Sequence, residues 1–148
     1  KAHYKYDSSV YPIKHPRYSN TDKPLTPYRV ETPAGAITVY PLAVLPLQIG
    51  RYTLRLPAAG GAYWRLLPLC YTKWALKKIN HSLNQGNVCY FHPWELDYEQ
   101  PYFAKLPLLT RFRHYHGIRG LETKLEEIFS TFKFAPLAEY HAVIGERQ

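Results

Sequence analysis

A short apolar run that ends at a proline is the feature of this sequence that most constrains its fold. Residues 88–91 are β-branched, aromatic or small and apolar, His92 follows them, and Gly86 comes just before. Runs of this kind are typical of short buried strands. Pro93 has no backbone N–H, so strand pairing must stop there. The pattern therefore predicts a strand over residues 88–92 with His92 at its carboxyl end, where α/β folds place their chemistry.

The residues that follow Pro93 add reactive groups. Trp94, Glu95 and Asp97 bring a flat aromatic face and two carboxylates within five residues of the His92 imidazole. An imidazole beside a carboxylate can transfer protons near neutral pH. A histidine that only satisfies its hydrogen bonds at a strand end would show the same pattern, so the residue types leave both interpretations open.

The segments before this run predict strands and a helix. One strand is predicted within residues 36–47, ending near Pro41 or Pro46, and a second over residues 49–56, where apolar and polar side chains alternate. After a glycine-rich turn, apolar residues at helical spacing predict a helix from near Pro68 to Leu83. A helix followed by a strand is half of an α/β unit, so the expected fold class is α/β.

Prolines and periodicity predict the remaining segments. Residues 14–33 contain four prolines, a density that precludes a helix, and are predicted to form a long surface loop. A helix over residues 121–132 is predicted to pack through an apolar face of five residues: Leu121, Leu125, Ile128, Phe129 and Phe132. Residues 134–144 are predicted to end the chain as a short strand.

Charge and aromatic content suggest an anionic partner. The net charge is +8, and aromatic residues make up 16% of the chain. Exposed aromatic faces can stack on bases or on the apolar faces of sugar rings, so a binding module for anionic glycan or single-stranded nucleic acid is one hypothesis. The basic residues are scattered and no nucleic-acid motif is recognisable, which argues against a nucleic-acid partner.

Other features bear on how complete the chain is. It starts on Lys1 and contains no methionine, so we expect a fragment of a longer protein. No run approaches the roughly 18 apolar residues of a membrane span and there is no signal-type start, so neither is predicted. Cys70 and Cys89 lie among apolar neighbours and are predicted to be buried free thiols, not parts of a disulfide framework or zinc site.

Several stretches together resemble a known family. They come in the family's order and cover about residues 4 to 136. They resemble the C-terminal part of bacterial NodB-type polysaccharide deacetylases (carbohydrate esterase family 4), in the branch linked to exosortase and exopolysaccharide loci. The matching stretches are residues 6–12, 60–68, 92–101, 111–115 and 132–134.

The resemblance implies a fold and a function. Residues 1–100 would form the later part of a distorted (β/α) barrel of polysaccharide-deacetylase type, and residues 101–148 a C-terminal helical extension packed on it. The parent protein would hydrolyse N-acetyl groups of amino sugars in a bacterial exopolysaccharide, which breaks a non-peptide C–N bond. The compartment stays open between the cytoplasm and the cell envelope.

The resemblance also implies a division of the active site. The family binds a divalent metal, zinc or similar, through one Asp and two His in an N-terminal half, within an Asp-Asp pair and a His-x-x-x-His motif. Neither motif occurs in this sequence. We therefore expect the metal in the parent protein and none in this chain, which alone would be inactive without its missing N-terminal half.

Individual roles follow from the matched motifs. His92 matches the histidine that protonates the leaving amine, and Asp7 is its expected carboxylate partner, with Glu95 as the alternative. A turn cap for Asp7, core packing for Trp94 and an ordinary surface position for Arg65 are equally open interpretations. The residues expected to contact the polysaccharide are Tyr11, His15, Arg17, Tyr63, Arg65, Trp94 and Glu95.

Overall fold

The structure, a computed structural model, describes residues 4–15, 18–83 and 86–145. These residues form a mixed α/β protein, which confirms the predicted fold class. The chain divides into two compact units. Unit 1 comprises Lys1–Gly60 and Trp74–Tyr90, and unit 2 comprises Gly61–Lys73 and Phe91–Gln148. The expected boundary between residues 100 and 101 concerned the parent barrel, and it stays a prediction.

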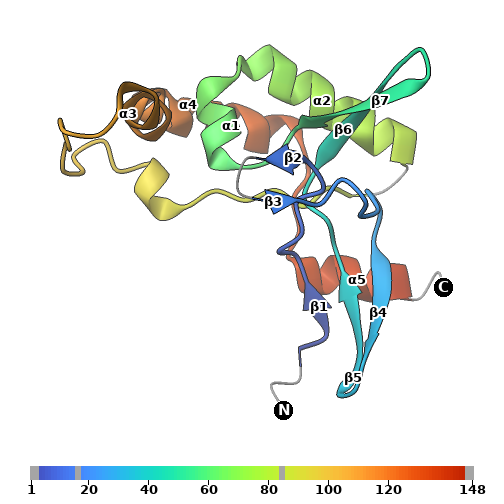
Figure 1. Cartoon of the computed structure of the whole chain (residues 1–148). Helices are drawn as coiled ribbons and strands as arrows, with labels where there is room; N and C mark the ends of the chain where they lie inside the picture. Colours follow the sequence, from blue (N-terminus) through green and yellow to red (C-terminus); the bar gives the residue numbers. More distant parts are fainter. Residues whose placement is uncertain (1–3, 16–17, 84–85, 146–148) are drawn as a thin grey trace. The chain divides into compact units, whose positions relative to one another are not determined.

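Unit 1 contains small sheets. β5 lies between β1 and β4, parallel to β1 and antiparallel to β4, while β2–β3 and β6–β7 form separate antiparallel pairs (Figure 1). The described part of the chain closes no barrel. The strands are β1 (Tyr6–Asp7), β2 (Lys14–His15), β3 (Tyr18–Ser19), β4 (Tyr28–Thr32), β5 (Gly35–Val39), β6 (Val44–Ile49) and β7 (Tyr52–Pro57).

The strands before α1 differ in part from the predicted ones. The strand predicted within residues 36–47 is β5, which ends at Val39 near Pro41, and residues 44–49 form a further strand, β6. β6 then pairs with β7, with Ile49 opposite Tyr52. The two-residue turn between them holds Gly50 at a φ of 56°, a left-handed conformation that glycine adopts without strain. The predicted loop over residues 14–33 also contains strands, because prolines exclude a helix but tolerate short edge strands.

The strand predicted at residues 88–92 is wrong. Val88 alone pairs, in an isolated parallel bridge with Leu42, and its carbonyl accepts the N–H of Ala43 at 3.0 Å. His92 has extended backbone, with φ −104° and ψ 143°, and leads directly into the short 3₁₀ helix η1 (Pro93–Glu95). An apolar run indicates burial, but a strand also needs a partner strand along its whole length, and only Val88 has one.

Helices make up most of unit 2. α2 confirms the helix predicted to end at Leu83, and its first residues belong to unit 2 and the rest to unit 1. None of the helices in the described residues combines the length and the apolar character that crossing a bilayer requires. Besides η1, the helices are α1 (Gly61–Leu66), α2 (Leu69–Leu83), α3 (Leu108–Tyr115), α4 (Ile118–Thr131) and α5 (Leu137–Gly145).

The predicted helix at 121–132 exists as α4, but its buried face is shifted. Ile118 and Ile128 are buried, together with Leu121 and Leu125 between them. Phe129 is 48% exposed, so its predicted burial is wrong. It lies four residues after Leu125, at the edge of the buried stripe and not at its centre, and its ring contacts that of Phe134 with centroids 4.9 Å apart. Phe132, just past the end of α4, is half-buried.

Two further predictions need correction. The strand expected over residues 134–144 is the helix α5, because a short apolar run cannot by its periodicity distinguish a strand from a helix. Cys70 and Cys89 are both free thiols, as predicted, but neither is fully buried, since Cys70 is exposed and Cys89 is half-buried. The apolar sequence neighbours of Cys70 point to other sides of α2, so they do not bury it.

Candidate functional site

Arg65 is the centre of a buried polar network in unit 2. Arg65 lies in α1 and is 2% exposed. Nη1 donates to the carbonyl groups of His114 and His116, both at 2.9 Å, and Nη2 donates to that of Arg113 at 3.2 Å. These carbonyls lie at the C-terminal end of α3, where the last turn of a helix leaves carbonyl groups without intrahelical partners. A cation is also favoured there by the helix dipole.

Glu95 completes the network from the other side. Its Oε1 lies 3.3 Å from Nε of Arg65, and both side chains are 1% exposed. Its Oε2 accepts the backbone N–H of His92 at 2.9 Å, which closes the start of η1. Gly61 leaves room for this carboxylate, because a Cβ at residue 61 would collide with Oε2. Position 61 therefore requires glycine, because the Glu95 side chain lies close to the backbone there.

Three rings lie beside this network, those of the exposed His92 and Trp94 and of the half-buried His114, and we call them the ring cluster. The His92 ring lies 6.0 Å from the Trp94 ring and the His114 ring lies 5.1 Å from it, with planes within 15° of parallel. The guanidinium carbon of Arg65 lies 5.6 Å from the Trp94 ring, a cation–π distance. Trp94 keeps 41% of its surface exposed. The cluster thus offers an aromatic face together with two imidazoles that can exchange protons.

Lys124 connects α4 to the end of α1. From α4 its Nζ donates to the carbonyls of Trp64 and Leu67 at 2.9 Å and to that of Arg65 at 3.2 Å, at the end of α1. Burial lowers the pKa of this amine. Gly117, with φ 76°, precedes α4, and a Cβ there would lie 2.5 Å from the Arg65 carbonyl oxygen. Glycine at this position therefore lets α4 approach α1.

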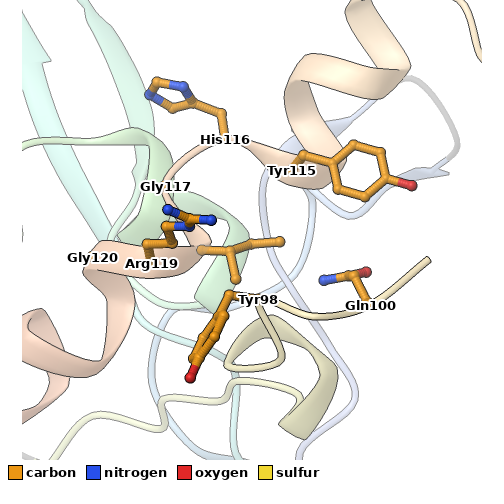
Figure 2. Close-up of a pocket in the computed structure, with 8 residues that line it drawn as sticks. Tyr98, Gln100, Tyr115, His116, Gly117, Arg119 and Gly120 are labelled. Carbon is orange, nitrogen blue, oxygen red and sulfur yellow. The ribbon is translucent and has the colours of Figure 1, made fainter. Parts of the chain in front are cut away.

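A pocket opens beside the ring cluster in the same unit. It has a volume of about 360 Å³ and is lined by Tyr98, Gln100 and residues 115–120 (Figure 2). Tyr98 and Gln100 follow η1 in the chain, and the other lining residues form the junction between α3 and α4. Tyr115 connects the pocket to the ring cluster. It lines the pocket, and its ring lies edge-on to the His114 ring, with centroids 4.6 Å apart.

Four of the residues predicted for the site lie together in unit 2. His92 and Trp94 are exposed at the surface, and Arg65 and Glu95 are buried beneath them. Direct contact of Arg65 and Glu95 with a polysaccharide stays a prediction. What the structure assigns to them is the positioning of the exposed rings. Tyr63 is half-buried in α1.

The other predicted residues lie elsewhere in the chain. The carboxylate of Asp7 accepts the N–H and the hydroxyl of Ser9, each at 3.0 Å, and so caps a turn in unit 1. His92 belongs to unit 2, and its pairing with Asp7 stays a prediction. Tyr11 is 2% exposed and donates its hydroxyl to the Ala59 carbonyl at 2.6 Å.

The two remaining residues of the predicted set come from the proline-rich segment. His15 lies in β2, opposite Tyr18. Arg17 lies outside the described residues. Their roles in binding stay predictions.

The described residues contain no group of three or more histidine, cysteine or acidic side chains that could hold a metal ion. The residues near His92 are instead aromatic rings, backbone carbonyls and a carboxylate already bonded to Arg65. Their chemistry is that of proton transfer and stacking.

Sequence reasoning missed several residues of this region. Lys124 was assigned no role, because its contacts lie at the end of α1, which is remote in sequence. Tyr98, Gln100 and Arg119 were assigned no role. The signal that could have found Arg119 is its position beside Gly117 and Gly120 at a helix start.

Comparisons with known proteins give one match. A family model described as "Domain of unknown function (DUF3473)" matches residues 8–142. No curated protein and no solved structure matches the chain. The match includes both the segment around Arg65 and the segment from His92 to Lys124, so the network, the ring cluster and the pocket all lie within it. This chain belongs to the DUF3473 domain family.

Proposed function

We propose that this chain is the C-terminal part of a polysaccharide deacetylase, in which His92 is the general acid and the ring cluster is a surface for the amino sugar. The observation that carries the proposal is the exposed Trp94 ring beside the nearly parallel His92 ring, above the buried pair of Arg65 and Glu95. An exposed indole stacks well on the apolar face of a sugar ring. This arrangement supports a sugar held next to a proton donor.

The chemistry of deacetylation requires such a donor. When the C–N bond of an acetamide breaks, the nitrogen leaves as a very poor leaving group unless it receives a proton. An imidazolium can donate that proton near neutral pH, and the neutral imidazole that remains can be protonated again by water. His92 would donate to the nitrogen of the substrate while the substrate ring lies against Trp94.

The buried network supports this role by fixing His92. Glu95 accepts the backbone N–H of His92, and Arg65 fixes Glu95 while also contacting the Trp94 ring. A catalytic group that is held in position by such contacts loses less entropy when the transition state forms. Glu95 and Arg65 are therefore positioning residues in this proposal.

The metal that the resemblance implies does not fit the described residues, because they form no ligand cluster. Its ligands would belong to another part of the parent protein, together with the earlier part of the (β/α) barrel. We assign no step in this chain to a metal.

The test is kinetic and uses the full-length deacetylase that contains this chain. His92→Ala should lower kcat by about 10²- to 10⁴-fold, which is the usual contribution of general acid catalysis. The matched control is His81→Ala, because His81 is an exposed histidine of α2 and should leave kcat unchanged. An unchanged kcat in His92→Ala would exclude the general-acid role.

The same experiment separates the rival function. A non-catalytic binding module for anionic glycan would lose affinity and raise KM in Trp94→Ala, while kcat stayed constant in His92→Ala. The exposed aromatic surface favours that rival as strongly as it favours the enzyme. The sequence upstream provides a second criterion, since an Asp-Asp pair and a His-x-x-x-His motif there would favour the enzyme.

A further inference from the structure

The pocket beside the ring cluster has features of a binding site for a charged ring. Its volume of about 360 Å³ lies in the range of roughly 300 to 1,000 Å³ that is usual for small-molecule sites. Its lining includes the guanidinium of Arg119, the exposed ring of Tyr98 and the amide of Gln100, besides the rings of Tyr115 and His116 (Figure 2). These groups differ from those of the ring cluster, so the pocket can recognise a different part of a ligand.

Arg119 provides the charge. It lies exposed in the first turn of α4, and its guanidinium forms no hydrogen bond or ion pair with any residue in the described ranges. By contrast, the guanidinium of Arg65 donates four hydrogen bonds within the protein. A guanidinium presents paired N–H donors that match the two oxygens of a carboxylate.

Gln100 and Tyr98 provide orientation. The Gln100 Nε2 donates to the carbonyl oxygens of Trp94 at 3.2 Å and Asp97 at 2.8 Å. Both N–H groups of the amide are therefore bonded within the protein, so the side chain is fixed. Its Oε1 remains as an acceptor for ligand hydroxyl groups. Tyr98 is 61% exposed and presents a ring on which a sugar face can stack.

Gly120 leaves space that the fold itself does not require. It lies in α4 and lines the pocket, and a Cβ there would meet nothing within 4 Å. Glycine inside a helix costs about 1 kcal/mol relative to alanine. Because no packing contact explains this glycine, the space above it is available to a ligand.

We propose that this pocket binds an acidic sugar residue, with the carboxylate on Arg119 and the ring against Tyr98. The inference rests on the proposed function and gives it a substrate class, an anionic polysaccharide that carries uronic acid residues. Gln100 and Tyr115 connect the pocket to the ring cluster, so one polysaccharide chain could occupy both. The net charge of +8 favours such a polyanion.

One acidic side chain lies close enough to matter. Glu122 lines an adjoining hollow of the same unit together with Arg119 and Tyr98. Its carboxylate should weaken the binding of an anion without blocking the pocket. This gives the proposal a variant that should increase affinity.

The experiment measures binding of a short galacturonic acid oligomer to the chain of residues 1–148 by titration calorimetry. Arg119→Gln should weaken binding about tenfold or more, as expected for a lost charge-assisted pair. Gly120→Leu should weaken binding similarly by filling the pocket, although leucine favours the helix. Arg113→Gln is the matched control, because it removes the same charge from an exposed residue that does not line the pocket.

Glu122→Gln should bind more tightly, a result that misfolding cannot produce. A neutral cellulose oligomer that binds as well as the acidic one would overturn the proposal. So would acetate alone binding with the same affinity, or single-stranded DNA binding more tightly through the same residues.

Failure of the proposed function is a separate result. If His92→Ala leaves kcat of the parent unchanged while the acidic oligomer binds as predicted, the acidic-sugar site is supported and the enzymatic role is excluded. If kcat falls but Arg119→Gln leaves binding of the oligomer unchanged, the enzymatic role stands and the acidic-sugar site is excluded.

Discussion

The two units of this protein build their interiors differently. In the described part of unit 1 the buried side chains are apolar or aromatic, such as Tyr40 and Leu45. In unit 2 the apolar stripe of α4 is accompanied by three buried polar residues, Arg65, Thr72 and Glu95. The difference lies in what the buried groups must satisfy, since unit 1 pairs its backbone in strands and unit 2 has helix ends to satisfy.

The two interiors differ in how strictly they fix the geometry of the side chains around them. A buried ion pair is costly to desolvate and seldom adds net stability over apolar packing. In unit 2 the guanidinium of Arg65 contacts η1, the C-terminal end of α3 and the Trp94 ring, and these elements present the exposed site residues. We infer that this network keeps the site in one geometry, while the apolar interior of unit 1 provides stability alone.

The largest effect should come from breaking the network. Arg65→Met leaves the Glu95 carboxylate buried without its partner and should cost about 3–5 kcal/mol of unfolding free energy, measured in urea. Adding Glu95→Leu should recover much of that loss, because both charges are then removed.

Leu45→Ala in unit 1 is the comparison for this prediction, and it should cost about 2–5 kcal/mol through the cavity it creates. The exposed pair of Lys73 and Glu127 is a further control, and Lys73→Met should change stability little. If Arg65→Met proves as mild as Lys73→Met, the contrast between the units is wrong.

A smaller effect should separate two glycines of unit 2. Gly61→Ala should cost about 1–3 kcal/mol, because the new Cβ collides with the Glu95 carboxylate and must displace it. Gly120→Ala should stabilise the protein by about 0.5–1 kcal/mol, because its Cβ meets open space and alanine favours the helix. Thermal unfolding of both variants checks the signs. Equal effects would mean that Glu95 adapts and that the network is not rigid.

The smallest effect concerns an ionisable group in unit 1. Burial raises the pKa of the Cys89 thiol to about 12, so the folded protein keeps this proton where the unfolded chain loses it. Stability from this group is complete below the unfolded pKa of about 8.5 and is lost as the pH rises toward 12. At pH 9.5 the loss should be about 1 kcal/mol.

Comparison with Cys89→Ala isolates this contribution. The tyrosines and lysines that titrate in the same pH range are the same in both proteins, so their effects cancel in the difference. The stability difference between the two proteins should shrink with rising pH. A difference that does not change between pH 8 and pH 10 would show that the thiol is accessible to solvent.

How much of the site could be predicted depended on the range of the interactions. The α2 and α4 helices were predictable because their apolar spacing is local. The importance of residues 92–95 was predictable too, because Pro93 and the chemical types around it are local signals. The strand at 88–92 failed because pairing needs a partner, and Leu42 alone supplies one.

By itself the sequence determined the mixed α/β class, the main helices, the basic charge and the stretch in which Trp94 and His92 stand. Spacing, proline and composition act within a few residues, so they need no knowledge of the fold. The tertiary structure alone decided that Arg65 would bind carbonyls 48 to 51 residues away and would be buried with Glu95. It also decided that Lys124 would cap α1 and that Arg119 would face a pocket. A charged side chain takes its role from the carbonyls and carboxylates that folding brings to it, and residue types along the chain do not specify those partners.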